Sequence, residues 1–121
     1  MSPASEQDIF IQLMNVIIQR KSASPNSSYT ASLLADGTPK ICEKIAEEAR
    51  ELVEAATEKG TAGHTHRIHE AADLIYHIWV YLAQQGISLD EVKAQLTERL
   101  GISGIAEKAS RPPNPRPTGE A

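Results

Sequence analysis

Apolar side chains recur every three or four residues along most of the chain, and this period predicts α-helices. The first predicted helix covers about residues 6–20 and has a wide apolar stripe: Ile9, Phe10, Leu13, Met14, Val16, Ile17 and Ile18. A stripe of this width indicates that the helix contacts more than one neighbour. A loop rich in serine follows at residues 22–28, and residues 29–35 are predicted to form a short helix that ends before Asp36 and Gly37.

The second long helix is predicted to begin at Thr38 as N-cap, with Pro39 at its first helical position. Aliphatic residues at helical spacing continue as far as Ala56, and charged residues, mostly Glu and Lys, occupy the other side. Gly60 and Gly63 are predicted to end this helix, because glycine is a poor residue for a helix interior.

A third helix is predicted from about His66 to Gln85, before Gly86, which is a natural stop for a helix. Apolar residues cover most of its circumference, as is typical of a central helix. The segment Ser88-Leu89-Asp90-Glu91 is a capping box, and it predicts a fourth long helix that ends before Gly101.

No alternating strand pattern competes with these helices, so the sequence predicts an all-α fold, an antiparallel bundle of four to five helices. The 121 residues fit one domain, which we place at residues 1–109. Residues 110–121 are rich in proline and poor in apolar side chains, and they predict a flexible tail. Aromatic residues make up only 4% of the chain, so the core must be mostly aliphatic.

Charge and apolar content exclude two classes of partner. The net charge is −4 and the basic residues form no run, which argues against a nucleic-acid binder. The longest apolar stretch, residues 68–83, is interrupted by acids and is too short to span a bilayer, and residues 1–8 do not resemble a signal peptide. The single cysteine, Cys42, is predicted to be a small core residue in a reducing compartment, so we expect a cytoplasmic protein.

Acidic residues occur where the helical pattern calls for apolar ones. On the second helix Glu48 falls on the apolar stripe and Glu51 at its edge. On the third helix Glu70, Asp73 and His77 form the one polar seam. Burying an ionised carboxylate without a partner costs several kcal/mol or more, so two helices that point acids inward suggest a cation between them.

The composition of this acidic set favours a hard metal ion. Its carboxylates come in pairs three or four residues apart, and the candidate ligands are Glu47, Glu48, Glu51, Glu70 and Asp73. Clustered carboxylates without cysteine favour Mg²⁺, or Mn²⁺, over zinc or copper. Lys40 and Lys44 precede the acids on the same helix and are candidates for binding phosphate oxygens.

Simpler interpretations compete with this one. Glu47, Glu51 and other acids of the helix could form a solvated face paired with Lys44 and Arg50, because charge runs on surfaces are commonplace. Three histidines are weak candidates for ligands: His64 and His66 are predicted to lie in or beside the loop before the third helix, where a histidine is more often solvated, and His69 on the outer edge of that helix. His77 lies one turn after Asp73, where it suits either a hydrogen bond behind a metal site or a satisfied core position.

The acidic pattern resembles that of a known superfamily. Glu47-Glu48-x-x-Glu51, then eighteen residues, then Glu70-x-x-Asp73 is similar to the signature of the MazG-like all-α nucleoside triphosphate pyrophosphohydrolases. The segments at residues 28–30, 40–49 and 72–77 resemble, more specifically, the phosphoribosyl-ATP pyrophosphatase family of histidine biosynthesis. The resemblance covers about residues 9–100.

The resemblance implies hydrolysis of 1-(5-phosphoribosyl)-ATP to 1-(5-phosphoribosyl)-AMP and pyrophosphate with Mg²⁺, in a bundle assembled from two chains. It implies metal binding and catalysis by the five acids and phosphate contacts by Lys40 and Lys44. We also predict that His77 contacts the substrate. The family often has glycine where this chain has Ala46, a change that favours the helix. The apolar surfaces of the first and third helices independently favour a homodimer.

Three alternatives stay open at this point. An enzyme of the same superfamily that clears noncanonical nucleoside triphosphates would share the acids, and a non-enzymatic dimeric scaffold would pair them with Lys44 or Arg99. A di-iron carboxylate bundle is less suitable, because the Glu-x-x-His pairs of such sites do not occur in this sequence.

Overall fold

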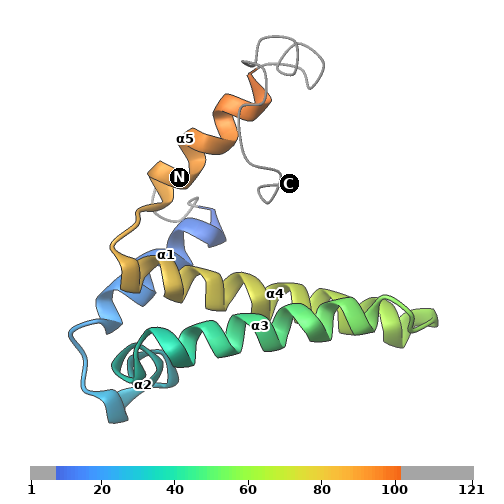
Figure 1. The fold of residues 1–121 in the computed structure, drawn as a ribbon, viewed down its shortest axis with the longest axis horizontal. Helices are drawn as coiled ribbons and strands as arrows, with labels where there is room; N and C mark the ends of the chain where they lie inside the picture. Colours follow the sequence, from blue (N-terminus) through green and yellow to red (C-terminus); the bar gives the residue numbers. More distant parts are fainter. Residues whose placement is uncertain (1–7, 102–121) are drawn as a thin grey trace, which may run out of the picture. The chain divides into compact units, whose positions relative to one another are not determined.

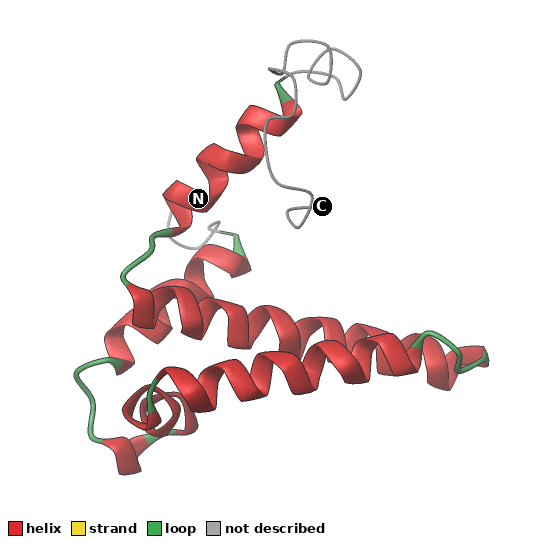
Figure 2. Cartoon of the chain, in the orientation of Figure 1, coloured by secondary structure: helices red, strands yellow, loops and turns green. Residues whose placement is uncertain are grey.

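The computed structural model describes residues 8–101, and all the elements in this range are helical (Figures 1 and 2). They are α1 (Ile9–Arg20), the 3₁₀ turn η1 (Pro25–Ser27), α2 (Tyr29–Asp36), α3 (Thr38–Ala55), α4 (Gly60–Gln85) and α5 (Leu89–Leu100). The all-α prediction is therefore confirmed for the described residues. The predicted tail at residues 110–121 lies outside them, and the predicted dimer stays a prediction.

The chain divides into two compact units, residues 1–89 and residues 90–121. Almost all of α5 belongs to the second unit, where it forms an amphipathic helix with Leu96 and Leu100 exposed. The first unit contains the other helices and the candidate site. The prediction of one domain over residues 1–109 stays a prediction.

Local capping fixes where the first helices begin. Asp8 caps α1, because its Oδ1 accepts a hydrogen bond from the backbone N–H of Phe10 at 2.9 Å, so the helix starts at Ile9 and not near residue 6. Ser28 caps α2 in the same way: its Oγ accepts from the N–H of Ala31 at 3.1 Å. These two caps therefore set the first residues of α1 and α2.

The prediction that Thr38 is the N-cap of the second long helix is wrong by one residue. Gly37 is the cap, with Thr38 and Pro39 in the first turn. Gly37 has φ +90°, a conformation that glycine adopts without the steric penalty of a Cβ atom. The chain turns from α2 into α3 at this residue, so Gly37 is both the C-cap of α2 and the N-cap of α3.

The boundary between α3 and α4 differs most from the prediction. Gly60 opens α4 with φ +73°, and Gly63 lies inside its first turns, whereas both were predicted to end the preceding helix. Gly63 is needed for close approach, since a Cβ atom there would lie 2.5 Å from the carbonyl oxygen of Glu58. As a consequence His64 and His66 are helical residues of α4 and not loop residues.

α3 and α4 form an antiparallel pair that lie side by side along most of their length (Figure 1). α1 and α2 pack against this pair and complete the core, whose buried members are Met14, Ile17, Leu33, Ile41, Val80 and Ala83. The Trp79 indole N–H donates to the carbonyl oxygen of Phe10 at 2.8 Å and ties α4 to α1. The inner faces of the α3–α4 pair thus have fixed positions.

Cys42 is exposed, so the prediction that it belongs to the core is wrong. Its neighbour Ile41 is fully buried, and one residue along an α-helix rotates the side chain by about 100°, which is enough to turn Cys42 to the surface. Among the described helices, none combines the length and the apolar character that crossing a membrane requires.

Candidate metal and active site

Acidic side chains meet between α3 and α4. Glu48 of α3 and Glu70 of α4 are only 7% and 6% exposed, as the sequence predicted for inward-facing acids. Glu51, one turn after Glu48, is half-buried. One carboxylate oxygen from each of these three residues lies within 4.8 Å of the other two, a spacing suited to shared ligation of one ion.

Two atoms of this cluster show that a positive charge would fit it. The Oε1 atoms of Glu48 and Glu70 are both buried, and neither has a hydrogen-bond partner. Buried polar atoms are almost always satisfied, so two unpaired carboxylate oxygens in one cluster require an explanation. A hard cation such as Mg²⁺ or Mn²⁺ provides it, because these ions prefer oxygen ligands.

The protonation behaviour of Glu48 reflects the same crowding. Burial raises the pKa of the Glu48 carboxyl, and the nearby carboxyl of Glu70 and the negative charge of Asp73 raise it further. Its environment therefore disfavours the ionised form when no cation is bound. A bound divalent ion would reverse this preference by supplying the missing positive charge.

Asp73 extends the cluster along α4. A ligand atom of Asp73 lies within 4.8 Å of atoms of Glu70 and His69, which makes a second group of three possible ligands. His69 Nε2 is 3.1 Å from Asp73 Oδ2, so this histidine, a weak candidate in the sequence, is next to the site. Four of the five predicted acids are thus brought into two groups that share Glu70.

Glu47 is the predicted ligand that the structure places differently. Among the described residues it belongs to neither group of possible ligands, and its Oε1 accepts a hydrogen bond from Lys44 Nζ at 2.9 Å. That bond lowers the pKa of Glu47 and raises the pKa of Lys44. Lys40 forms a similar exposed pair with Glu43 at 3.5 Å, so both predicted phosphate contacts lie on the outer edge of α3.

His77 is buried, 5% exposed, and both ring nitrogens are engaged. Nδ1 is 2.8 Å from the backbone carbonyl oxygen of Asp73, which can only accept, so Nδ1 carries a proton and donates. Nε2 is 3.2 Å from the Tyr29 hydroxyl, and in the neutral imidazole Nε2 accepts a hydrogen bond from this hydroxyl. His77 therefore links the backbone beside the acids to Tyr29 of α2.

Tyr29 is the first residue of α2 and contacts α4 through His77. Its ring stacks against Tyr76 with centroids 6.2 Å apart, and the Tyr76 hydroxyl is hydrogen-bonded to the hydroxyl of Thr30. Burial raises the pKa of Tyr29, and the positive charge of Lys44 opposes the rise. Tyr29 is thus close enough to α3 for the charge of Lys44 to affect its pKa.

His66 is the functional candidate that sequence reasoning missed. It was expected to be a solvated residue near a loop, but its Nδ1 is 2.9 Å from Glu58 Oε1 and its Nε2 is 3.1 Å from Glu70 Oε2. The bond to Glu58 is the main cause of a raised pKa for His66. The i, i+4 spacing of His66 and Glu70 was a usable signal, but only if α4 was known to begin at Gly60.

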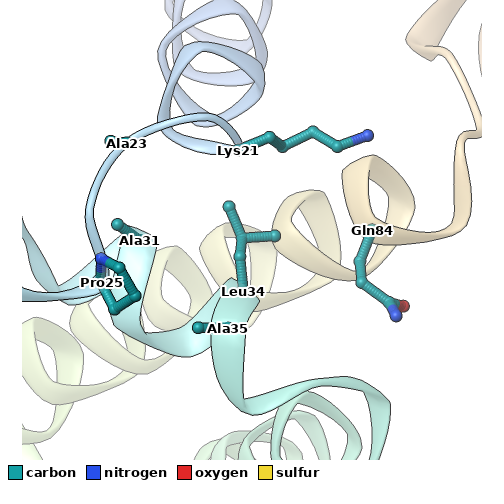
Figure 3. A pocket seen from close by; sticks show the side chains of 7 residues that line it. All are labelled: Lys21, Ala23, Pro25, Ala31, Leu34, Ala35 and Gln84. Atoms are coloured by element: carbon teal, nitrogen blue, oxygen red, sulfur yellow. The ribbon is translucent and has the colours of Figure 1, made fainter.

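A separate cavity of about 250 Å³ lies beside α2 (Figure 3). Figure 3 shows it lined by Lys21 at the end of α1, by small side chains of α2 and by Gln84 of α4. The Lys21 ammonium already donates to the carbonyl oxygen of Ala83 at 3.0 Å. No acid lines this cavity, so it is distinct from the acidic cluster.

Comparisons with known proteins agree with the chemistry of the cluster. A family model described as phosphoribosyl-ATP pyrophosphohydrolase matches residues 10–100. A phosphoribosyl-ATP pyrophosphatase of Rhodopirellula baltica is 52% identical over 84% of this chain and 84% of its own length. One of Trichlorobacter lovleyi is 51% identical over 88% and 96%. The chain is thus a hydrolase that belongs to the phosphoribosyl-ATP pyrophosphohydrolase family.

Proposed function

We propose that this chain hydrolyses 1-(5-phosphoribosyl)-ATP to 1-(5-phosphoribosyl)-AMP and pyrophosphate with Mg²⁺, as the second step of histidine biosynthesis. In this reaction water is added across the anhydride between the α and β phosphates. The observation that carries the proposal is the pair of buried, unpartnered Oε1 atoms of Glu48 and Glu70. The names of the relatives supply the substrate.

Glu48, Glu51 and Glu70 would hold the ion, because one oxygen of each lies within 4.8 Å of the others, and Asp73 would join them from the second group, which shares Glu70. Bound Mg²⁺ would lower the pKa of a water molecule and draw charge from the phosphate oxygens. These residues would hold the ion between the inner faces of α3 and α4. We place the phosphate chain of the substrate along the outer edge of α3, beside Lys40 and Lys44.

Lys44 is the residue we propose to meet the phosphates on that edge, with Lys40 one turn earlier. Lys44 currently binds Glu47, in a pair whose Glu47 side chain is 39% exposed. Ion pairs of this kind contribute only about 0–1 kcal/mol. A substrate phosphate, with more negative charge than one carboxylate, can therefore replace Glu47 at little cost.

For His77 the contact with substrate stays a prediction, and we place it through Tyr29. Neither nitrogen of the buried ring has a free position, because one is bonded to the Asp73 carbonyl and the other to the Tyr29 hydroxyl. Tyr29 itself is exposed beside Lys44. His77 would thus orient the tyrosine that faces the substrate.

We also propose that the protein is a homodimer. An apolar groove of about 410 Å³ runs between α1 and α4, lined by Ile9, Phe10, Leu13, Ile68, Ala71, Ala72 and Ile75. Ile9 and Ile68 are 66% and 58% exposed in the single chain. Exposed apolar surface of this kind is typical of an interface. Sedimentation of the chain as a stable monomer at micromolar concentration would contradict the dimer.

The test of the function is pyrophosphate release from 1-(5-phosphoribosyl)-ATP with and without Mg²⁺, for the wild type and for Glu48→Gln. Glu54→Gln, at an exposed position of the same helix, is the matched control. We expect Mg²⁺-dependent turnover in the wild type and the control only. Faster hydrolysis of a panel of noncanonical nucleoside triphosphates would instead favour the rival enzyme of the superfamily, and no hydrolysis of any of them would favour the scaffold.

A further inference from the structure

His66 lies between two carboxylates that come from different parts of the fold. Its Nδ1 is 2.9 Å and 3.0 Å from the two carboxylate oxygens of Glu58, and its Nε2 is 3.1 Å from Glu70 Oε2. Glu58 belongs to the turn that joins α3 to α4, whereas Glu70 is the acid shared by both groups of possible metal ligands. The histidine therefore connects the turn to the metal site.

The turn that provides Glu58 is held tightly against α4. Arg67 Nη1 donates to the carbonyl oxygens of Ala55 at 3.0 Å and of Glu58 at 2.9 Å. The backbone of Glu58 lies close to Gly63: a Cβ atom at position 63 would be 2.5 Å from the carbonyl oxygen of Glu58. Glu58 is thus attached to a fixed backbone, and His66 is bonded to a fixed partner.

This arrangement divides the two oxygens of Glu70 between two tasks. Oε2 is bonded to His66, while Oε1 is buried without a partner. A carboxylate with one oxygen held cannot rotate freely about its last bond. The oxygen left for a cation is therefore Oε1, in a side chain that is only 6% exposed.

We propose that His66 is a positioning residue that, supported by Glu58, holds Glu70 in the orientation that binds the metal ion. The inference rests on the proposed function, because it assumes that the acidic cluster binds a divalent ion. His66 is not itself in either group of possible ligands among the described residues, and both of its nitrogens are engaged. Mutation of a residue that orients a metal ligand in this way typically weakens metal binding by about 10–100-fold.

A competing effect determines how the test must be designed. Removing His66 alone would leave the negative charge of Glu58 near the site, and that charge would attract a cation whether or not Glu70 is well oriented. Replacing both residues by glutamine removes the histidine and the carboxylate together. The positive and negative charges of an ionic Glu58–His66 pair are then lost in equal number, and any loss of affinity reports orientation.

The experiment measures the Kd of Mn²⁺ from the free-ion electron paramagnetic resonance signal, without substrate. We expect His66→Gln with Glu58→Gln to weaken Mn²⁺ binding by about tenfold or more. The matched control, His64→Gln with Glu54→Gln, makes the same substitutions at exposed positions of α4 and α3 and should leave the Kd unchanged. With substrate present, the Mg²⁺ concentration for half-maximal activity should rise while kcat at saturating Mg²⁺ stays near the wild-type value.

Each outcome has a separate meaning. Unchanged or tighter Mn²⁺ binding by a double variant with a wild-type circular dichroism spectrum overturns the inference, since the pair would then be neutral or compete with the ion for Glu70. If the double variant does not fold, His66→Gln alone must still weaken Mn²⁺ binding, although the remaining negative charge of Glu58 attracts the ion. A wild type that binds no Mn²⁺, or a Glu48→Gln variant with an unchanged Kd, contradicts the proposed function itself.

Discussion

Glu47 and Glu48 are neighbours in the sequence and share one family-like motif, but they lie in opposite environments. Glu48 belongs to the inner face of the α3–α4 pair, where it is buried, its pKa is raised and its Oε1 has no partner. Glu47 belongs to the outer edge of α3, where Lys44 binds it at 2.9 Å and lowers its pKa. One residue of helical rotation separates a buried carboxylate with an unpartnered oxygen from a carboxylate in a partly exposed ion pair.

The difference teaches that the position of an acid on the helix decides its role. On the inner face, burial penalises the charge of Glu48, and Glu48 and Glu70 each keep one buried oxygen without a partner. Residues of the outer edge are already neutralised by lysines one turn away. Neutralising an inner-face acid should therefore lower activity without lowering the stability of the metal-free protein. Neutralising an outer-edge acid should have a smaller effect on activity.

The largest expected effect comes from Glu48→Gln on the inner face. We expect Mg²⁺-dependent turnover to fall on the order of 100-fold or more, which corresponds to about 2.7 kcal/mol of lost transition-state stabilisation. Asp73→Asn should act in the same direction from α4. Glu47→Gln should lose less than about tenfold, since it removes a partly exposed ion pair and no member of the buried cluster.

Thermal melting of the same variants without metal completes this test. Glu48→Gln should be neutral or stabilising, because it relieves repulsion with Glu70 and Asp73. In a scaffold with buried ion pairs the same change would strand a partner and cost roughly 3–5 kcal/mol. A destabilised Glu48→Gln that keeps full turnover would contradict the metal site, and equal losses in the Glu47 and Glu48 variants would erase the distinction between the two faces.

Mg²⁺ itself should stabilise the protein through the inner face. A ligand that binds only the folded state at a concentration of 100 times its Kd adds about 2.7 kcal/mol to the free energy of unfolding. We expect the melting temperature of the wild type to rise with Mg²⁺, the rise to survive in Glu47→Gln and to be lost in Glu48→Gln. Scanning fluorimetry with Mg²⁺ and with excess chelator measures this, and equal rises in all three proteins would place the ion elsewhere.

A third effect, smaller again, is a pH dependence of the metal-free protein. The pKa of Glu48 is raised above its ordinary value of 4.5, so between these two values the folded state binds more protons than the unfolded state. The contribution of Glu48 to stability is therefore full below pH 4.5 and is lost as the pH rises through the raised pKa. Urea unfolding across this range should show the wild type losing stability relative to Glu48→Gln, and parallel curves would contradict the raised pKa.

The sequence predicted the inner face well, because that face depends only on helical period. Glu48 and Glu70 were placed inside from the apolar positions around them, and burial confirms both. The order of the helices followed from the same period and from the turn residues between them. These features are local, so a sequence pattern contains the information that specifies them.

The rest depended on contacts between elements. Gly60 and Gly63 have the composition of a helix end, but at the α3–α4 turn glycine is required by a positive φ and by the close backbone of Glu58. The error in the start of α4 also concealed His66, whose partner Glu58 is reached only through that turn. Cys42 was misplaced because its apolar neighbours do not extend to its side of the helix.

The smallest expected effect concerns Tyr29, which lies where the inner face and the outer edge meet. Lys44 of the edge and Glu48 of the inner face both influence its pKa, after burial, which is the main cause of its rise. Its hydroxyl bonds to the buried Nε2 of His77. Tyr29→Phe removes that hydroxyl and leaves the ring, so it tests whether the two faces act as one substrate site.

We expect Tyr29→Phe to raise the KM for 1-(5-phosphoribosyl)-ATP a few-fold with little change in Mn²⁺ affinity, because no metal ligand is altered. The loss of the bond should also cost about 1–3 kcal/mol of stability, since His77 Nε2 is left buried and unsatisfied. Tyr76→Phe is the matched comparison: it removes the hydroxyl bonded to Thr30, away from the acids, and should lower stability without moving KM. If both variants lower stability and neither changes KM, Tyr29 is a packing residue, and only the inner face and Lys44 remain as the substrate site.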